Sequence, residues 1–314
     1  MALLPIPPGR PEWLALRRRH IGASEVAILF GVAPDYLPGP YALWQVKAGH
    51  IEPEDVDNER TRAGLKLEDA IAEMAAEKEG WTVQPGIYGS VHGLGATLDR
   101  IIAAPGPNDP GCSGPGVLEI KNVDWLVHRR SWGDEPPMHI LLQLQAQLAA
   151  TGYTWGAVAA LIGGNHVEVY RYQPRPKLQA EIIRRVRHFW ASIEAGTPPA
   201  PDGSDATYRA LLQLAPGEDH APAELDADEA ALKAAADYLA ASAAEKDAER
   251  KRKEARNILI HALGNHRWGM GGGYQIRQAV MDESPGTLIT AEMIGTRIGA
   301  RAQSRRLTVK ELKA

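Results

Sequence analysis

The sequence is short of cysteine, of long apolar runs and of net positive charge. Cys112 is its one cysteine, so a single chain can form neither a disulfide nor a cysteine-based metal site, which suits a reducing cytoplasm. No stretch of the sequence approaches the ~18 apolar residues of a membrane span. The first residues lack the charged and apolar regions of a signal peptide. We therefore expect a soluble, cytoplasmic protein.

The formal net charge of −4 gives no overall basic signature, but local patches matter more than the sum for nucleic-acid binding. The basic residues are clustered, and each cluster alone is more typical of a solvated helix face. The clusters are Arg17-Arg18-Arg19, Arg129-Arg130, Arg184-Arg185, Lys251-Arg252-Lys253 and Arg305-Arg306. Charge alone therefore neither predicts nor excludes a nucleic-acid partner.

Alternating helical and strand patterns predict an α/β (α+β) fold with a central sheet. The predicted helices are 60–79, 138–151 and 176–195, and the predicted strands are 81–91, 95–103, 117–121, 155–162 and 167–172. These elements form a first domain over residues 1–200. Proline-rich residues 201–222 predict a linker, and residues 223–314 a C-terminal appendage. Within it, 223–263 predict one long helix or a helical hairpin, and 274–277 a short strand.

One group of charged residues on these strands suits phosphodiester hydrolysis. Glu119 and Lys121 are two apart on one strand, so their side chains share a face. Asp99 lies near the middle of the preceding strand, and a hairpin would bring it to Glu119. Two carboxylates and the backbone carbonyl of Ile120 suit Mg²⁺, with Mn²⁺ as a substitute. Lys121 could then orient or deprotonate the attacking water and offset transition-state charge.

A lone Glu-x-Lys is more often part of a solvated strand surface. Here the triplet is flanked by the apolar residues Val117, Leu118 and Val123. A charged face on an apolar strand needs a reason, because burying unpaired carboxylates is costly. A bound metal would remove that cost, so the sequence favours the metal site.

The pattern of Asp99 followed by Glu119-Ile120-Lys121 resembles the PD-(D/E)xK nuclease superfamily. Four further motifs resemble those of the YqaJ-like viral recombinases, which include lambda exonuclease. They are His20-Ile21-Gly22-Ala23-Ser24-Glu25, Gly64-Leu65-Lys66-Leu67-Glu68, Gly95-Ala96-Thr97-Leu98-Asp99 and Gln143-Leu144-Gln145-Ala146-Gln147. The resemblance covers residues 13–175. It implies a restriction-endonuclease-like core, with a mixed central sheet flanked by helices, followed by a C-terminal helical appendage.

The resemblance also implies catalytic roles. Asp99, Glu119 and the Ile120 carbonyl would bind metal, and Lys121 would serve the nucleophilic water. Glu68 would lie near a second metal or a water.

The glutamine motif implies a residue that orients the substrate phosphate or the lysine. Gln143 and Gln145 are two apart on a helix and cannot share one face, so only one should point into the site. We favour Gln145.

The resemblance implies that Arg17, Ser24 and Thr97 form a pocket for a terminal 5′-phosphate. Ser24 precedes an apolar run and reads as a helix N-cap, where free N–H groups can bind an anion. The spacing between Arg17 and Ser24 favours Arg17 over Arg18 and Arg19 as the phosphate ligand. The sequence departs from the family pattern at Leu98, usually proline, at Arg100, usually glycine, and at Thr97, usually serine.

The implied function is 5′→3′ exonuclease action on double-stranded DNA with 5′-phosphorylated ends. It would leave 3′ strands for a single-strand annealing protein, in the cytoplasm of a bacterium carrying a phage or prophage. The family also suggests a homo-oligomer. Two alternatives stay open: a structure-specific or restriction-like endonuclease, and a catalytically inactive DNA-end-binding adaptor. The intact Asp99, Glu119 and Lys121 argue against the adaptor.

Overall fold

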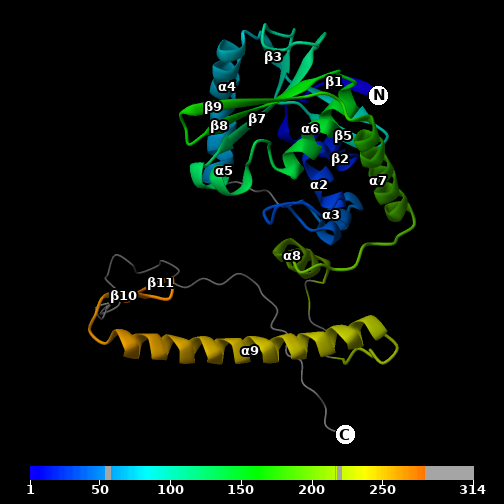
Figure 1. Ribbon diagram of the computed structural model, residues 1–314. Helices are drawn as coiled ribbons and strands as arrows, with labels where there is room; N and C mark the ends of the chain where they lie inside the picture. The colour runs from blue at the N-terminus through cyan, green and yellow to red at the C-terminus, as the bar shows by residue number, and fades with distance from the viewer. Residues whose placement is uncertain (54–57, 216, 218–220, 280–314) are drawn as a thin grey trace, which may run out of the picture. The chain divides into compact units, whose positions relative to one another are not determined.

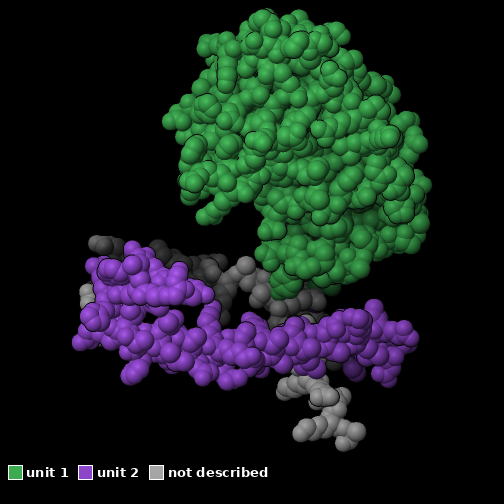
Figure 2. Space-filling view, viewed as in Figure 1, with its two compact units in different colours: residues 1–216 green, residues 217–314 purple. Residues whose placement is uncertain are grey.

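A computed structural model describes residues 1–53, 58–215, 217 and 221–279. The chain divides into two units, Met1–Pro216 and Gly217–Ala314, which Figure 2 shows in separate colours. Unit 1 contains two mixed sheets flanked by helices, which confirms the predicted α/β class. None of the described helices combines the length and apolarity needed to cross a bilayer.

The helices of unit 1 are α1 (Arg10–Arg18), α2 (Val26–Leu29), α3 (Pro40–Lys47), α4 (Glu59–Glu79), α5 (Trp125–Ser131), α6 (Met138–Thr151), α7 (Pro176–Glu194) and α8 (Asp205–Leu214). A 3-10 turn, η1 (Ala23–Glu25), precedes α2. The strands are β1 (Ala2–Pro5), β2 (Ile21–Gly22), β3 (Val83–Pro85), β4 (Ile87–Val91), β5 (Leu94–Thr97), β6 (Arg100–Ile102), β7 (Gly116–Val123), β8 (Gly156–Ile162) and β9 (His166–Tyr172).

A five-stranded sheet of order β3-β6-β7-β8-β9 carries the predicted catalytic strand, β7. Its β7–β8 pair is parallel and its other pairs are antiparallel. Every residue of β8 is buried, because α4 covers one face and α6 the other (Figure 1). Side chains alternate along the strand, so Ala157 and Ala159 join the core on the α4 face while Val158 and Ala160 join the core on the α6 face.

Helix α6 lies between the five-stranded sheet and a four-stranded sheet of order β1-β4-β5-β2. Its residues Leu144 and Leu148 pack in the core beside β7 and β8. Leu142 and Ala146 pack instead with α2 and α7. A helix that is apolar on nearly all sides must be covered on all of them, and this explains the burial of α6.

The predicted strands 81–91 and 95–103 are each divided between the two sheets. The first breaks at Gly86 into β3 and β4, and the second breaks at Leu98 and Asp99 into β5 and β6. The Leu98 amide donates to the Ile87 carbonyl oxygen at 2.9 Å, and a Cβ on Gly86 would lie only 1.8 Å from the Leu98 oxygen. The prediction of Asp99 at the midpoint of one strand is wrong: it lies where the chain crosses between sheets.

Two further predictions are corrected. Ser24 is not a helix N-cap: it lies inside η1, and the cap residue of the four-residue α2 is Glu25. The region 201–222 is not simply a linker, because it contains α8. Asp202 holds α8 against α3 by accepting from Thr207 Oγ1 and the Ser204 amide, both at 2.9 Å, and from the Tyr41 amide at 3.4 Å.

Unit 2 contains α9 (Glu229–Leu263), capped by Asp228, and the hairpin of β10 (Trp268–Gly271) and β11 (Tyr274–Arg277). One long helix, rather than a helical hairpin, therefore fills most of 223–263. The predicted strand 274–277 is confirmed. Gly272 and Gly273 form the hairpin turn with φ of 56° and 81°, which glycine adopts without steric cost.

Candidate active site

Asp99 lies beside the part of the β7 edge that β6 leaves uncovered. The β6–β7 pairing reaches only Arg100 opposite Leu118. Beyond it, the Ile120 amide donates to Asp99 Oδ2 at 2.8 Å. The N–H and C=O of a strand residue point to the same side, so the Ile120 carbonyl faces the Asp99 edge as well. The predicted convergence of Asp99 on the Glu119-Ile120-Lys121 triplet is therefore present.

Glu119 is fixed by three donors on the α6 face of β7. It is 1% exposed. Its Oε1 accepts from Lys121 Nζ and from Gln143 Nε2, the latter at 2.7 Å, and its Oε2 accepts from Gln147 Nε2 at 2.5 Å. Lys121 also donates to Gln143 Oε1 at 3.2 Å. The carboxylate, the ammonium and the two amides form one hydrogen-bonded network.

The charges of this network are unbalanced. Burial and the neighbouring Glu119 raise the pKa of Asp99 well above its usual range, against the opposing effect of Lys121. Burial opposes the charged form of Lys121, but Glu119 and Asp99 outweigh it and raise the pKa of Lys121. Two buried carboxylates thus share one ammonium, and a divalent cation beside Asp99 and Glu119 would relieve their repulsion.

The donor set suits a hard cation that keeps some water or phosphate ligands. Within the described ranges, no three His, Cys, Asp or Glu side chains are grouped for metal binding. The available donors are the Asp99 and Glu119 carboxylates and the Ile120 carbonyl, all oxygen. Mg²⁺ typically takes one or two carboxylates and leaves the remaining positions to water and substrate. The residues therefore fit Mg²⁺.

Glu68 lies beside this site but is paired. Its Oε1 accepts from Arg100 Nη1 at 2.6 Å, and Arg100 also bonds Asp69 and the Asp99 carbonyl oxygen. The charge of Glu68 contributes to the raised pKa of Asp99, after the larger effects of burial and Glu119. Arg100, where the family pattern has glycine, thus pairs with the carboxylate for which the resemblance implies a place near a second metal or a water.

Gln145 does not point into the site. Its Nε2 donates to the Gln173 carbonyl oxygen at 2.9 Å, and its Oε1 accepts from the Arg175 amide at 2.8 Å. It therefore holds the connection between β9 and α7. The preference for Gln145 over Gln143 is corrected, and the sequence reading missed Gln147. The available signal was spacing: Gln143 and Gln147 are four apart and share a helix face.

A cavity of about 1300 Å³ in unit 1 connects the site to solvent. Its lining includes Arg17, Ser24, Glu68, Asp99, Glu119, Ile120, Lys121 and Gln143. Unit 1 is visibly hollowed in Figure 2, between the part that holds α4 and α5 and the part that holds α3 and α8. Most of the residues predicted for metal, catalysis and phosphate binding thus border one space.

Two of the three residues predicted for the phosphate pocket, Arg17 and Thr97, are linked through Trp13. Trp13 Nε1 donates to Thr97 Oγ1 at 3.2 Å, and the Arg17 guanidinium lies 4.7 Å from the centre of the Trp13 ring. Arg17 Nη2 is 3.4 Å from Glu25 Oε1. Thr97 does not itself line the cavity. Because α2 has only four residues, a helix N-terminus no longer supports an anion site at Ser24.

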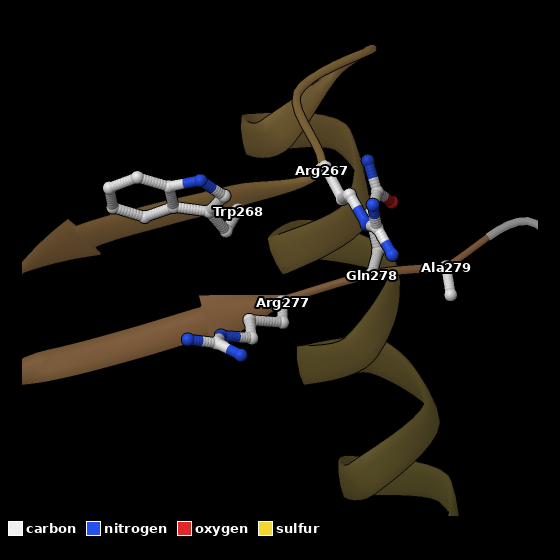
Figure 3. Close-up of a pocket in the computed structure, with 5 residues that line it drawn as sticks. All are labelled: Arg267, Trp268, Arg277, Gln278 and Ala279. Atoms are coloured by element: carbon white, nitrogen blue, oxygen red, sulfur yellow. The ribbon is translucent and has the colours of Figure 1, made fainter.

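Unit 2 has a smaller cavity, of about 480 Å³, next to its hairpin (Figure 3). Its lining residues are Arg267, Trp268, Arg277, Gln278 and Ala279. The Gln278 amide group donates to the Gly264 and His266 carbonyl oxygens, at 2.7 and 2.9 Å, and so ties the hairpin to the end of α9. None of the described residues that line this cavity has a carboxylate, so these residues do not offer the carboxylate ligands found in unit 1.

The chain is similar in sequence to known proteins. Residues 12–154 match the sequence model of the YqaJ-like viral recombinase domain. The uncharacterized protein YqaJ of Bacillus subtilis strain 168 is 26% identical over 275 residues, which cover 85% of this chain and 82% of that protein.

Among solved structures, the alkaline exonuclease LHK-Exo from Laribacter hongkongensis is 21% identical, with a TM-score of 0.48, over 59% of this chain and 93% of its own. A phage-related exonuclease from Haemophilus somnus 129PT is 8% identical, with a TM-score of 0.35, over 60% of this chain and 90% of its own. TM-scores below 0.5 do not by themselves establish a common fold. The sequence match identifies residues 12–154 as similar to the YqaJ-like viral recombinase domain.

Proposed function

We propose that this chain is a divalent-metal-dependent deoxyribonuclease that hydrolyses double-stranded DNA from 5′-phosphorylated ends and leaves 3′ single strands. The observation that carries the proposal is the meeting of Asp99, Glu119 and Lys121 at the open edge of β7, inside a solvent-connected cavity. Similarity to a viral recombinase domain supports DNA as the substrate.

Asp99, Glu119 and the Ile120 carbonyl would hold Mg²⁺ or Mn²⁺. Such an ion polarises a phosphate oxygen and lowers the pKa of a water molecule, which makes hydrolysis possible at neutral pH. The Lys121 ammonium lies against Glu119 and can donate to a phosphate oxygen or orient the attacking water. Gln143 and Gln147 fix the Glu119 carboxylate, so its oxygens need not reorganise when substrate binds.

Arg17 is the best-placed candidate to bind a terminal phosphate. It borders the cavity, its guanidinium is stacked on Trp13, and a guanidinium can bind phosphate with two parallel hydrogen bonds. Its contact with Glu25 is long, at 3.4 Å, and can be exchanged for phosphate. Thr97 would act through Trp13, whose indole it holds, and Ser24 through its place on the cavity wall.

The test uses end-labelled duplexes with and without a 5′-phosphate, closed circular DNA, and Mg²⁺ or a chelator. We expect Mg²⁺-dependent release of mononucleotides from linear DNA, faster with the phosphate, and intact circles. Asp99→Asn and Lys121→Ala should abolish release, whereas Lys177→Ala, on the exposed face of α7, should not. Rapid cutting of circles would instead indicate an endonuclease. Binding of DNA ends without hydrolysis would indicate an adaptor, and activity in both site variants would refute the site.

Under this proposal, the 3′ strand passes to a single-strand annealing protein in the cytoplasm of a bacterial host, and the enzyme acts as a homo-oligomer. Light scattering during size-exclusion chromatography measures the oligomeric state. A monomer that remains active would refute that part alone.

A further inference from the structure

An exposed tyrosine stands beside the proposed active site on a stiff loop. The segment between α2 and α3 contains Pro34 and Pro38, α3 begins at Pro40, and proline fixes the backbone φ angle. The Leu37 amide donates to the Pro34 carbonyl oxygen at 2.9 Å, which closes a turn around Tyr36. Tyr36 is 76% exposed. The loop thus holds a large ring in solvent at little further entropic cost.

His139 braces this ring from the start of α6. The Tyr36 hydroxyl lies 3.4 Å from His139 Nε2, and the two rings meet edge to face, with centres 6.4 Å apart and planes at 81°. His139 is one helical turn before Gln143, which contacts Glu119. The aromatic pair therefore has a fixed place relative to the catalytic network.

Contacts and the cavity lining connect the pair to Lys121. His139 lies one helical turn before Gln143, whose Oε1 accepts from Lys121 Nζ at 3.2 Å. Burial and the Lys121 ammonium lower the pKa of His139. Tyr36 borders the same cavity as Asp99, Glu119 and Lys121. A single exposed aromatic residue needs no explanation, but one braced at the mouth of a reaction site does.

We infer that Tyr36, braced by His139, is a stacking platform for the nucleobase of the terminal nucleotide. The inference rests on the proposed function, since it assumes a phosphodiester beside Lys121. A nucleotide whose phosphate lies there carries its base on the adjacent sugar, within reach of the cavity mouth. Every base has a π face, so stacking on tyrosine would accept any terminal base and would compensate for its lost pairing in the duplex. The ligand class is an unpaired terminal nucleobase.

The experiment uses 5′-phosphorylated duplexes that carry 2-aminopurine either at the terminal nucleotide or ten nucleotides inside. Binding is measured in Ca²⁺, which takes longer and less regular oxygen coordination than Mg²⁺ and so slows hydrolysis. The chains compared are wild type, Tyr36→Ala, Tyr36→Phe and Tyr274→Ala. Tyr274 is the matched control, because it is a similarly exposed tyrosine, 75%, in unit 2.

We expect wild type, Tyr36→Phe and Tyr274→Ala to quench the terminal probe and to leave the internal probe unchanged. Tyr36→Ala should lose the quenching and bind the end roughly 5- to 150-fold more weakly, as expected when one base–aromatic stack is removed. Equal quenching in Tyr36→Ala, or quenching of the internal probe, would overturn the inference. Cleavage without terminal quenching would overturn the platform alone, and terminal quenching without Mg²⁺-dependent cleavage would overturn the nuclease alone.

Discussion

Replacing Lys47 should destabilise unit 1 more than any change of a surface charge. Lys47 Nζ donates to Glu25 Oε2 at 2.8 Å and to the carbonyl oxygens of His20 and Arg17 at 2.8 and 3.1 Å. The Lys47 side chain is 3% exposed, and that of Glu25 is 16% exposed. In Lys47→Met the Glu25 carboxylate loses its main counter-charge but stays out of water.

Removing one partner of a buried pair costs about 3–5 kcal/mol, because the other charge is left uncompensated. In a domain of this size each kcal/mol lowers the melting temperature by roughly 2–4 °C, so a loss of about 6–20 °C is expected. The measurement is urea and thermal unfolding followed by tryptophan fluorescence. Lys47→Met combined with Glu25→Gln should recover much of the loss, since glutamine removes the orphaned charge and can still accept from the Gly22 amide.

Arg184→Met is the control, since Arg184 is 65% exposed and its surface pair with Glu181 should contribute little to stability. Burial opposes ionisation of Glu25, but Lys47 and Arg17 outweigh it, so the pKa of Glu25 is below its usual 4.5. The ionised form therefore stabilises the fold above pH 4.5, and this contribution is lost as pH falls through the lowered pKa. The difference in the free energy of unfolding between wild type and Lys47→Met should therefore become smaller in acid. If Lys47→Met lowered the free energy of unfolding by less than about 1 kcal/mol at neutral pH, the reasoning would be refuted.

Three further predictions concern the site and its supports. Gln147→Leu should lower hydrolysis about 10- to 100-fold by releasing the catalytic carboxylate, whereas Gln145→Leu should lower only stability; equal activity in the two variants would contradict the geometry. Arg100→Ala should free the Glu68 carboxylate on α4 and increase the number of Mn²⁺ ions bound per chain, as measured by calorimetry. An unchanged stoichiometry would count against the neutralisation of Glu68 by Arg100. Gly86→Ala should cost about 1–3 kcal/mol or more in urea unfolding, because its Cβ would strike the opposite strand. Gly133→Ala, with no atom within 4 Å, should cost little; equal costs would mean that the crossing relaxes easily.

The sequence is sufficient to predict the elements in which apolar residues recur at the spacing of the buried face. Helix α6 was predicted as 138–151 and spans Met138–Thr151, and the predicted 60–79 helix spans Glu59–Glu79. Both present apolar residues at helical spacing over many turns. The pairing of Asp99 with Glu119 was likewise predictable, because two β-forming segments joined by a proline- and glycine-rich loop favour a hairpin.

The wrong predictions concern positions where tertiary contacts, and not the local sequence, determine the structure. Residues 95–103 have the composition of one strand, and nothing local marks the change of sheet at Leu98. Ser24 has the side chain of a helix cap, but the chain continues as a 3-10 turn and the half-buried Glu25 takes the cap position. Gln145 and Gln147 are chemically identical, so only the packing of α6 between two sheets shows which one meets Glu119.

The passage of the two strands from one sheet to the other, at Gly86 and Leu98, also affects how the domain can bend. The two sheets are joined there by two continuous backbones, so bending between them would be concentrated at this hinge. Thr97, with the Trp13 contact, lies on one side of the hinge, while Glu119 lies on the other. Asp99 sits at the pivot. A change in the angle between the sheets would therefore change the spacing between Thr97 and Glu119, while Asp99, which is bonded to the Ile120 amide, would keep its place beside β7.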